Sequence, residues 1–452
     1  MLDWRGLVIA TQASTESIAE QILAAASKEG EEAEVFYVSS SSTPVHFEAN
    51  QIKAVDSNES SGAALRLIKN GRVGFGSSSD LGNIDSLISS AIETSQFGAE
   101  AKFQFPGKTD LPEVPVFDPS VNDVSLEEMV ALGQHVIDEL RAHSDEVQVE
   151  GGVSHSTSTI TLLNSRGGQV SYARTGFRIG FEATVIRGED MLFTFDGQSS
   201  VSPITDPSEM IAAIIRQLAW AKDTATVETK TMPVILMPAA VPSILLSPLL
   251  AGLSGKSVLQ GTSPLAEKMG EKIVDERFTM IDDSTLPWIP ASSPSDDEGI
   301  ASRRLPLIES GMVGTFLYDL QTAGLAGAQS TGSGERGLGS LPSPSAGVLV
   351  VGEGDTSLDN IIADMSEGLI VEALLGAGQS NVLGGDFNAN ILLGYKIENG
   401  KVVGRVKNTM ISGNAYKALN NLIAIGNDGR WVRGGLFAPT IALADVSVSA
   451  NG

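Results

Sequence analysis

The chain contains no cysteine among its 452 residues. This absence excludes disulfide bonds, thiolate metal ligands and a cysteine nucleophile, and it is typical of a protein of the reducing cytoplasm, where we expect this one to be. Histidine is also scarce. The four histidines are His46, His135, His143 and His155, and none belongs to an H-E-x-x-H pattern that would bind zinc.

Basic residues are few, with 30 Lys and Arg against 55 Asp and Glu, so the formal net charge is −25. Proteins that bind nucleic acid normally carry a basic face that displaces counterions from phosphates. We therefore expect no direct contact with nucleic acid. The acidic balance also opposes binding to an anionic membrane surface, and residues 7–10 form too short an apolar run for a signal peptide.

One stretch, between Lys230 and Lys256, lacks charge and is long enough to span a membrane. Proline interrupts it repeatedly, and each proline removes a helix hydrogen bond. The prolines are Pro233, Pro238, Pro242 and Pro248. The composition therefore favours a buried strand followed by a short buried helix, and we expect no membrane span.

The order of the patterned segments predicts an α+β protein in three parts. We predict a sandwich-like N-terminal α/β domain at residues 1–115 and a sandwich-like middle α+β domain at 116–228. Residues 229–452 are predicted to form a mostly β, barrel-like domain. A proline-rich passage at 106–119 separates the first two parts as an extended connector.

The first part is predicted to begin with a helix that is capped by Ser14 or Thr15 and closed by Gly30. Asn70-Gly71 between apolar runs indicates a hairpin, because both residues tolerate the positive φ of a type I′ turn. A second helix is expected at 84–97. The predicted strands are residues 34–38, 45–49, 52–56, 63–69 and 72–76.

The second part opens with a capping box from Ser125 to Glu128 at the start of a helix. A later helix is expected to begin at Asp206, with Glu209 completing a similar box. The strand-like runs between them are residues 147–155, 159–163, 169–174 and 177–186.

The third part carries two further hairpin signals, at 308–311 and 397–400. A Gly- and Ser-rich segment at 323–345 interrupts it and is interpreted as a mobile or ligand-contacting loop. Within that loop, residues 332–337 match G-x-G-x-x-G. No strand is predicted before the match and no helix after it, so a dinucleotide site is not expected.

Two groups of polar residues could carry chemistry. His135, Glu139 and His143 fall within one sector of a predicted helix, but they flank its apolar stripe as solvated residues do. Asp296 and Asp297 stand beside Glu298, and adjacent carboxylates can hold a cation or act as acid and base, although such a run is more often a turn. No G-x-S-x-G pattern indicates a serine hydrolase.

The ordered set of segments resembles the TldD/PmbA family, also known as modulators of DNA gyrase, over nearly the whole length. The matching segments are residues 61–66, 70–75, 297–299, 303–304, 307–311, 385–387, 397–400, 411–414, 424–428 and 438–440. Family members of the TldD kind carry H-E-x-x-x-H and a late cysteine that bind zinc for peptide hydrolysis. Members of the PmbA or TldE kind lack these ligands and pair with the first kind.

In this sequence Ser247 and Pro248 stand where the resemblance places the first His-Glu pair, and Gly252 stands near the second His. A catalytic zinc needs three protein ligands and an open position. The resemblance is therefore to the PmbA/TldE kind. It implies no catalytic or metal-binding residue and no cofactor in this chain, with zinc in a partner subunit.

The resemblance implies a structural and substrate-binding subunit of a heteromeric metalloprotease that acts on peptides or unfolded protein. An extended peptide is expected to lie along strand edges, where main-chain hydrogen bonds accept many sequences. We expect two segments to shape that channel or the subunit contact. They are Asp297-Glu298-Gly299 and Gly385-Asp386-Phe387.

Two alternatives remain open from the sequence. The first is a stand-alone peptide-binding or scaffold protein, for example a homodimer, without a protease partner. The second is an independent enzyme that uses the acidic run at 296–298. A neighbouring gene that encodes H-E-x-x-x-H would favour the heteromer over both.

Overall fold

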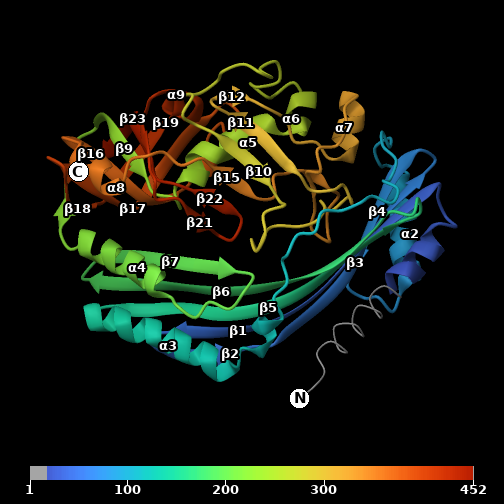
Figure 1. Ribbon diagram of the computed structural model, residues 1–452, viewed down its shortest axis with the longest axis horizontal. Coiled ribbons are helices and arrows are strands. Elements are labelled where there is room, and N and C mark those ends of the chain that lie inside the picture. The colour runs from blue at the N-terminus through green and yellow to red at the C-terminus, as the bar shows by residue number, and fades with distance from the viewer. Residues whose placement is uncertain (1–17, 451–452) are drawn as a thin grey trace.

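The computed structural model describes residues 18–450. Figure 1 shows a long, curved sheet along one side of the molecule, with the C-terminal half of the chain resting on the inner face of its curve. The helix predicted at the start of the chain covers residues 18–26, and Ile22 and Ala26 are fully buried on its inner side. Its predicted caps, Ser14 and Thr15, lie outside the described residues.

The curved sheet has seven antiparallel strands in the order β4-β3-β1-β5-β6-β7, with β2 paired to β1. Strands from the first and second predicted parts meet in its middle, where β1 pairs with β5 along almost its whole length. The strands are β1 (Glu32–Glu48), β2 (Gln51–Val55), β3 (Asn58–Lys69), β4 (Arg72–Ser78), β5 (Gln148–Asn164), β6 (Gln169–Arg187) and β7 (Asp190–Ser200).

Three of these strands are longer than the sequence indicated. The runs at 34–38 and 45–49 belong to the one strand β1, and the four runs between 147 and 186 form only β5 and β6. The polar residues between those runs stay in the ladder, for example Ser40 opposite Ser158. A strand continues through polar residues when both neighbours supply backbone hydrogen bonds, so hydrophobic alternation alone placed the ends too early.

Helices α2 (Ile84–Ser95), α3 (Leu126–His143) and α4 (Ser208–Trp220) pack against the ends of this sheet (Figure 1). The predicted capping box of α3 is present, with the Ser125 side chain and Glu128 each accepting from the other's backbone. The predicted box of α4 is wrong, because the helix begins two residues later than expected. Asp206 instead accepts a hydrogen bond from Ser208 N at 2.9 Å.

The C-terminal part contains a closed barrel of five strands, in which β16-β9-β23-β19-β17 returns to β16. This confirms the predicted α+β class with a barrel-like, mostly β end. The strands of this sheet are β8 (Thr224–Ala225), β9 (Lys230–Leu236), β16 (Glu367–Leu375), β17 (Asp386–Glu398), β18 (Lys401–Val406), β19 (Thr409–Asn414), β20 (Leu422–Ile425) and β23 (Ile441–Ala450).

A six-stranded sheet and a two-stranded pair lie beside the barrel. Their strands are β10 (Met280–Asp283), β11 (Arg304–Glu309), β12 (Met312–Val313), β15 (Leu349–Val351), β21 (Arg430–Val432) and β22 (Leu436–Ala438), with β13 (Gly334–Glu335) and β14 (Ser343–Pro344). The helical segments are η1 (Pro119–Asp123), η2 (Pro242–Leu246), α5 (Ser247–Leu253), α6 (Gly255–Leu259), α7 (Leu320–Ala326), α8 (Leu358–Ala363), η3 (Ala377–Gln379) and α9 (Ala415–Asn420).

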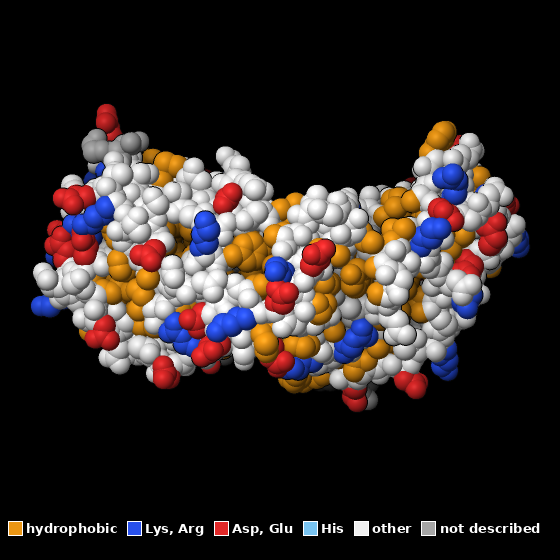
Figure 2. Space-filling model, turned by 90° about the horizontal axis from the view of Figure 1, so that it is seen from above, with side chains coloured by type: hydrophobic (Ala, Val, Ile, Leu, Met, Phe, Trp, Pro, Cys, Tyr) orange, Lys and Arg blue, Asp and Glu red, His pale blue; other side chains and the backbone are white. Residues whose placement is uncertain are grey.

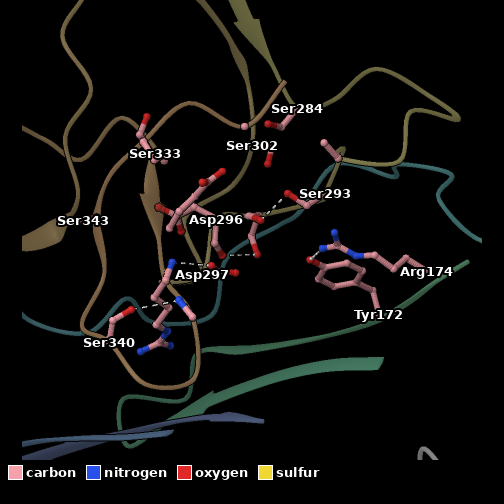
Figure 3. Close-up of a pocket in the computed structure, with 18 residues that line it drawn as sticks. Tyr172, Arg174, Ser284, Ser293, Asp296, Asp297, Ser302, Ser333, Ser340 and Ser343 are labelled. Atoms are coloured by element: carbon pink, nitrogen blue, oxygen red, sulfur yellow. Dashed lines mark hydrogen bonds between the residues drawn. The ribbon is translucent and has the colours of Figure 1, made fainter. Parts of the chain in front are cut away.

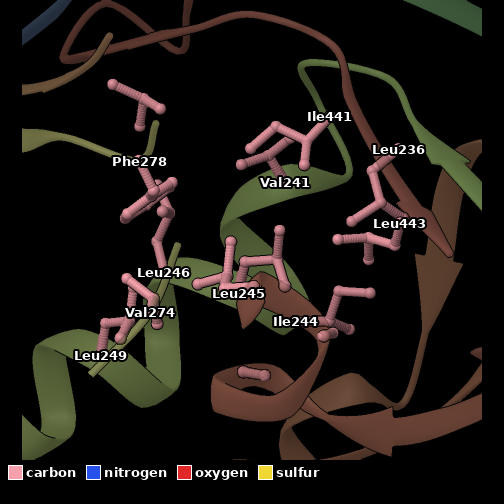
Figure 4. Packing of buried hydrophobic residues seen from close by; sticks show 14 of the residues in the cluster. Leu236, Val241, Ile244, Leu245, Leu246, Leu249, Val274, Phe278, Ile441 and Leu443 are labelled. Atoms are coloured by element: carbon pink, nitrogen blue, oxygen red, sulfur yellow. The ribbon is translucent and has the colours of Figure 1, made fainter. Parts of the chain in front are cut away.

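The uncharged stretch at 230–256 forms strand β9, a π-helical turn and the short helix α5, as predicted. Its side chains fill the barrel rather than a bilayer, and Ile244, Leu245 and Leu249 are fully buried in one cluster with barrel strands (Figure 4). Among residues 18–450, no helix is both long and apolar enough to cross a membrane.

All three predicted two-residue hairpins are present. Asn70-Gly71, Ser310-Gly311 and Asn399-Gly400 each have positive φ at both positions, as a type I′ turn requires.

On the face shown in Figure 2, basic side chains are interspersed with acidic ones.

Candidate functional site

A cavity of about 510 Å³ lies between the curved sheet and the loops of the C-terminal part (Figure 3). Tyr172 and Arg174 enter it from β6, because residues two apart on a strand share a face. The Arg174 guanidinium donates to Tyr172 Oη at 2.7 Å. Serines supply much of the remaining wall: Ser284, Ser293, Ser295, Ser302, Ser333, Ser340, Ser343 and Ser345.

The acidic run at 296–298 divides between this cavity and the protein interior. Asp296 and Asp297 line the cavity, whereas Glu298 points into the interior and is 1% exposed. Asp296 accepts three backbone hydrogen bonds, from Glu298, Ile300 and Gly334, at 2.9–3.0 Å. Asp297 accepts one from Arg336 N at 2.9 Å. Asp296 thus fixes a turn as well as facing the cavity.

Glu298 belongs to a buried group of four charged residues that we call the interdomain ion cluster: Glu34, Arg66, Glu298 and Arg336. Arg66 donates to both Glu34 oxygens at 2.8 Å and to Glu298 Oε1 at 2.6 Å. Arg336 Nη2 lies 2.8 Å from Glu34 Oε1, and its side chain has no exposed surface. Because β1 and β3 supply two members and C-terminal loops the other two, the cluster joins the two halves of the molecule.

Burial and the neighbouring charges together shift the pKa values in and beside the ion cluster. Burial alone would raise the pKa of Glu34, but Arg336 and Arg66 outweigh it and hold that pKa below its usual value. Burial raises the pKa of Glu298, and the charge of Arg66 only partly offsets this. Burial and the neighbouring Glu298 raise the pKa of Asp296 well above its usual value. Removal of Arg66 would therefore leave Glu298 buried without an arginine partner.

Gly299 completes the contact with the curved sheet. Its φ of +79° lies in the left-handed region, and a Cβ atom there would lie 2.9 Å from a methyl carbon of Leu162. Both features require glycine. The segment Asp297-Glu298-Gly299 therefore has three distinct surroundings: the cavity, the ion cluster and the sheet.

The second predicted segment lies elsewhere. Phe387 is 3% exposed and packs in the same apolar cluster as the barrel, while Asp386 accepts a hydrogen bond from the Asn414 side chain at 2.9 Å. A Cβ atom at Gly385 would lie 2.5 Å from the ring of Tyr416. The structure thus does not bring Gly385-Asp386-Phe387 together with Asp297-Glu298-Gly299 in the cavity.

Two further carboxyls at the cavity were not singled out from the sequence. Burial raises the pKa of Glu335, which lines the cavity, and raises the pKa of Asp282, just behind its wall, to about 7. Asp282 Oδ1 accepts from the backbone nitrogens of Gly347 and Val348. Hydroxyls, carboxyls and one guanidinium can satisfy the backbone and polar groups of a bound peptide from several directions.

The residues at the expected zinc position do not fit the metal. Ser247 is exposed and donates to Pro242 O, and Pro248 offers no ligand atom from its side chain. A Cβ atom at Gly252 would lie 2.7 Å from Tyr416 Oη, so that space is already filled. Over residues 18–450 no group of three or more His, Asp or Glu side chains could hold a metal ion.

The structure explains two further sequence motifs, the His and Glu residues of one helix face and the glycine-rich loop. His135, Glu139 and His143 are all exposed on α3, as a solvated helix face predicts. The glycine-rich loop at 332–337 contains the short strand β13 and lines the cavity, with no helix after it. It therefore contacts the candidate site, and its Arg336 side chain reaches the ion cluster.

Sequence reasoning missed the roles of Glu34, Arg66 and Arg336. One signal was available: Arg66 interrupts the otherwise apolar run at 63–68, and a charged residue in such a run needs a buried partner. The partner's identity was not available, because Glu298 lies 232 positions away in the chain.

Three consecutive segments match domains of one protein family. Residues 33–95 match PmbA/TldA metallopeptidase domain 1, residues 119–222 match the central domain, and residues 229–450 match the C-terminal domain.

Individual relatives agree with that match. The chain is 27% identical to an uncharacterized protein of Methanocaldococcus jannaschii over 93% of this chain and 97% of that protein. It is 28% identical to a metalloprotease TldD homolog of Buchnera aphidicola over 62% of this chain and 61% of that protein.

Solved structures extend the likeness to the whole fold. The crystal structure of TldE from Thermococcus kodakarensis has a TM-score of 0.87 at 25% identity, covering 96% of this chain and 100% of that one. A proposed modulator of DNA gyrase from Thermotoga maritima has a TM-score of 0.85 at 20% identity, with the same coverage, and supports the fold alone.

Proposed function

Because the chain belongs to the TldD/PmbA metallopeptidase family, we propose that it is the non-catalytic, substrate-binding and structural subunit of a TldD–TldE-type heteromeric metalloprotease. The catalytic zinc belongs to a TldD-like partner in this proposal, and the substrate is a peptide or an unfolded protein segment.

The observation that carries the proposal is the filled position at Gly252. Zinc hydrolysis needs ligands that hold the metal and leave one position open for water. Here Tyr416 Oη donates to Pro248 O at 3.2 Å and occupies the space beside Gly252. Restoring a histidine would therefore require moving Tyr416 as well as changing the residue.

The cavity at Asp296 and Asp297 supports a role in substrate binding. It is lined by polar side chains and joins two halves of the molecule, where ligand sites often lie. The ion cluster behind it holds the cavity wall in place without taking part in chemistry. Both features suit a subunit that positions a chain for cleavage by another protein.

The test is a pull-down of the full-length chain, tagged at its own locus, followed by mass spectrometry and by reconstitution. We expect a stoichiometric partner that carries H-E-x-x-x-H. The pair should hydrolyse an unfolded peptide substrate, and a zinc chelator should abolish that activity. This chain alone should be inactive.

Two results would overturn the proposal. Peptide hydrolysis by this chain alone, unaffected by chelator, would assign catalysis to the acidic residues of the cavity. Self-association with no zinc-bearing partner would instead favour a homo-oligomeric peptide-binding or scaffold protein.

A further inference from the structure

A second cavity, of about 390 Å³, lies between β7 of the curved sheet and β21 of the C-terminal part. Its walls carry apolar side chains from both halves of the molecule. These are Ile179, Phe195, Met237, Trp431 and Val432. The lining also carries charged side chains, so the cavity offers both apolar and charged contacts to a small ligand or a side chain.

The acidic groups of this cavity already have partners. Arg430 Nη2 donates to both oxygens of Asp196, at 3.0 and 2.8 Å. Arg216 Nη2 lies 3.0 Å from Glu372 Oε1. The remaining acid, Asp428, accepts hydrogen bonds from the Thr440 backbone and hydroxyl.

Two arginines of the lining, Arg178 and Arg433, have no acidic partner in the cavity. Both are exposed, and in the described part of the chain neither makes an ion pair or a side-chain hydrogen bond with protein. The cavity lining holds four arginines, Arg178, Arg216, Arg430 and Arg433, against three acids, Asp196, Glu372 and Asp428. This local excess of positive charge contrasts with the net charge of −25 on the whole chain.

The fold brings the two arginines to one place. Arg178 on β6 lies directly opposite Ser199 on β7. The residue after Arg433 is Gly434, whose Cβ position lies 3.2 Å from Ser199 Cβ. Ser199 therefore separates the backbones that bear the two guanidinium groups, and both side chains line the same cavity.

The backbone at Arg433 belongs to the tight turn that joins the antiparallel strands β21 and β22. Arg433 and Gly434 both have positive φ, +54° and +76°, as in the other hairpin turns of this protein. This turn carries the Arg433 side chain at the edge of the cavity.

We propose that this cavity binds a carboxylate that carries an apolar group, with Arg178 and Arg433 on the carboxylate and Trp431 against the apolar group. A guanidinium matches the geometry of a carboxylate through two parallel hydrogen bonds. The ligand class includes the C-terminal end of a peptide and free arylalkanoic acids. The assignment to a peptide end rests on the proposed function, whereas the carboxylate site does not.

The experiment measures binding to the full-length chain by calorimetry and by tryptophan fluorescence, to which Trp431 contributes. The probes are an acetylated tetrapeptide that ends in phenylalanine with a free carboxylate, the same peptide as its C-terminal amide, and 3-phenylpropionate. We expect the free acid to bind about tenfold or more tightly than the amide, because the amide has no charge for the two arginines. Binding of the acid should weaken as salt increases.

Variants locate the site. Arg178→Gln and Arg433→Asn should each weaken binding of the free acid about tenfold, and asparagine suits the left-handed backbone at 433. The matched control is Arg187→Gln, an exposed arginine of the same strand β6 that pairs with Glu146 outside the cavity. It should bind the acid as the unmodified chain does.

The outcomes are distinct. Tighter binding of the peptide than of 3-phenylpropionate identifies a peptide end, and equal binding identifies a free organic acid. Equal binding of acid and amide, no binding up to about 10 mM, or an equal loss in Arg187→Gln would overturn the carboxylate site. A carboxylate site in a chain that captures no protease partner would leave this inference standing and the proposed function rejected.

Discussion

Two buried regions of this molecule are held together in opposite ways. The interdomain ion cluster of Glu34, Arg66, Glu298 and Arg336 joins the two halves with charges, and each of those side chains is at most 3% exposed. The barrel interior around Leu245 is apolar throughout its cluster. The stabilisation from a buried charge pair requires that every partner is present and correctly oriented. The stabilisation from apolar packing depends mainly on the volume and shape of the side chains.

The two regions therefore differ in what they specify. The ion cluster fixes how β1 and β3 meet the loops at Glu298 and Arg336, and with them the wall of the serine-lined cavity. The barrel supplies the apolar burial that stabilises the C-terminal part. A substitution in the first should alter the site as well as stability, and a substitution in the second should alter stability alone.

The largest effect is expected for Arg66→Met. It leaves Glu34 and Glu298 buried without their shared partner, so the free energy of unfolding should fall by about 3–5 kcal/mol. Urea unfolding followed by circular dichroism measures the change. Arg187→Met is the control: its ion pair with Glu146 is more than half exposed, and its loss should cost less than about 1 kcal/mol. Equal stability of the two variants would contradict a structural role for the ion cluster.

A similar or slightly smaller loss, about 2–5 kcal/mol, is expected for Leu245→Ala, because it leaves a cavity beside a fully buried position. Leu245→Met keeps the volume and should cost less than about 1.5 kcal/mol. No such tolerance is expected at Arg66, where lysine cannot keep the pairing with both oxygens of Glu34. Thermal unfolding of Arg66→Met, Arg66→Lys, Leu245→Ala and Leu245→Met compares the two regions. A Leu245→Met variant as unstable as Leu245→Ala would argue against apolar packing by volume.

A smaller effect is expected for Gly252→Ala, at the edge of the barrel. The added Cβ would lie 2.7 Å from Tyr416 Oη and 3.1 Å from Leu265 Cδ1, so overpacking should cost about 1–3 kcal/mol. Tyr416→Phe in the same chain should recover part of the loss. Gly339→Ala, which has no atom within 4 Å of its Cβ position, should leave the melting temperature unchanged. Full stability of Gly252→Ala would show that the position is open, and it would weaken the proposed function.

The last effect is a change in pH dependence at the polar cavity. Burial raises the pKa of Asp282 from 3.8 to about 7 in the folded chain. The folded state therefore binds this proton more tightly than the unfolded state does. The resulting stabilisation is present below pH 4 and is lost as pH rises through about 7.

Asp282→Asn keeps an oxygen that can accept from Gly347 and Val348 but cannot ionise. Between pH 4 and 7 its free energy of unfolding should decline less steeply than that of the unmodified chain, by at most about 1.4 kcal/mol per pH unit. Urea midpoints at several pH values measure both slopes. Parallel slopes would show that Asp282 ionises normally in the folded chain.

Local features were predictable from the residues alone. The Asn-Gly and Ser-Gly hairpins and the Ser125 capping box depend on a few neighbouring residues, and their geometry follows from φ preferences and side-chain hydrogen bonding. The alternation of strand and helix in the uncharged stretch at 230–256 followed from its prolines. The absence of a zinc motif at Ser247, Pro248 and Gly252 could also be recognised from the sequence, because it depends only on which residue types are present.

Features that depend on distant pairing were not predictable. The strand ends in β1, β5 and β6 follow from neighbours on both sides, which carry polar segments such as Ser40 within the ladder. The ion cluster brings together residues from positions 34 to 336. The pattern of apolar residues along the chain does not indicate which buried acid pairs with which arginine.

The sequence by itself determined the α+β class, the order of hairpins and helices, the family resemblance and the absence of an H-E-x-x-x-H motif, because each depends on local geometry or on residue identity. Only the tertiary structure decided that one sheet would unite the first two parts, that Glu298 would face Arg66 rather than the cavity, and that Arg178 and Arg433 would share a second cavity. Those outcomes depend on which surfaces meet when the chain closes, and packing and charge pairing across more than two hundred residues determine them.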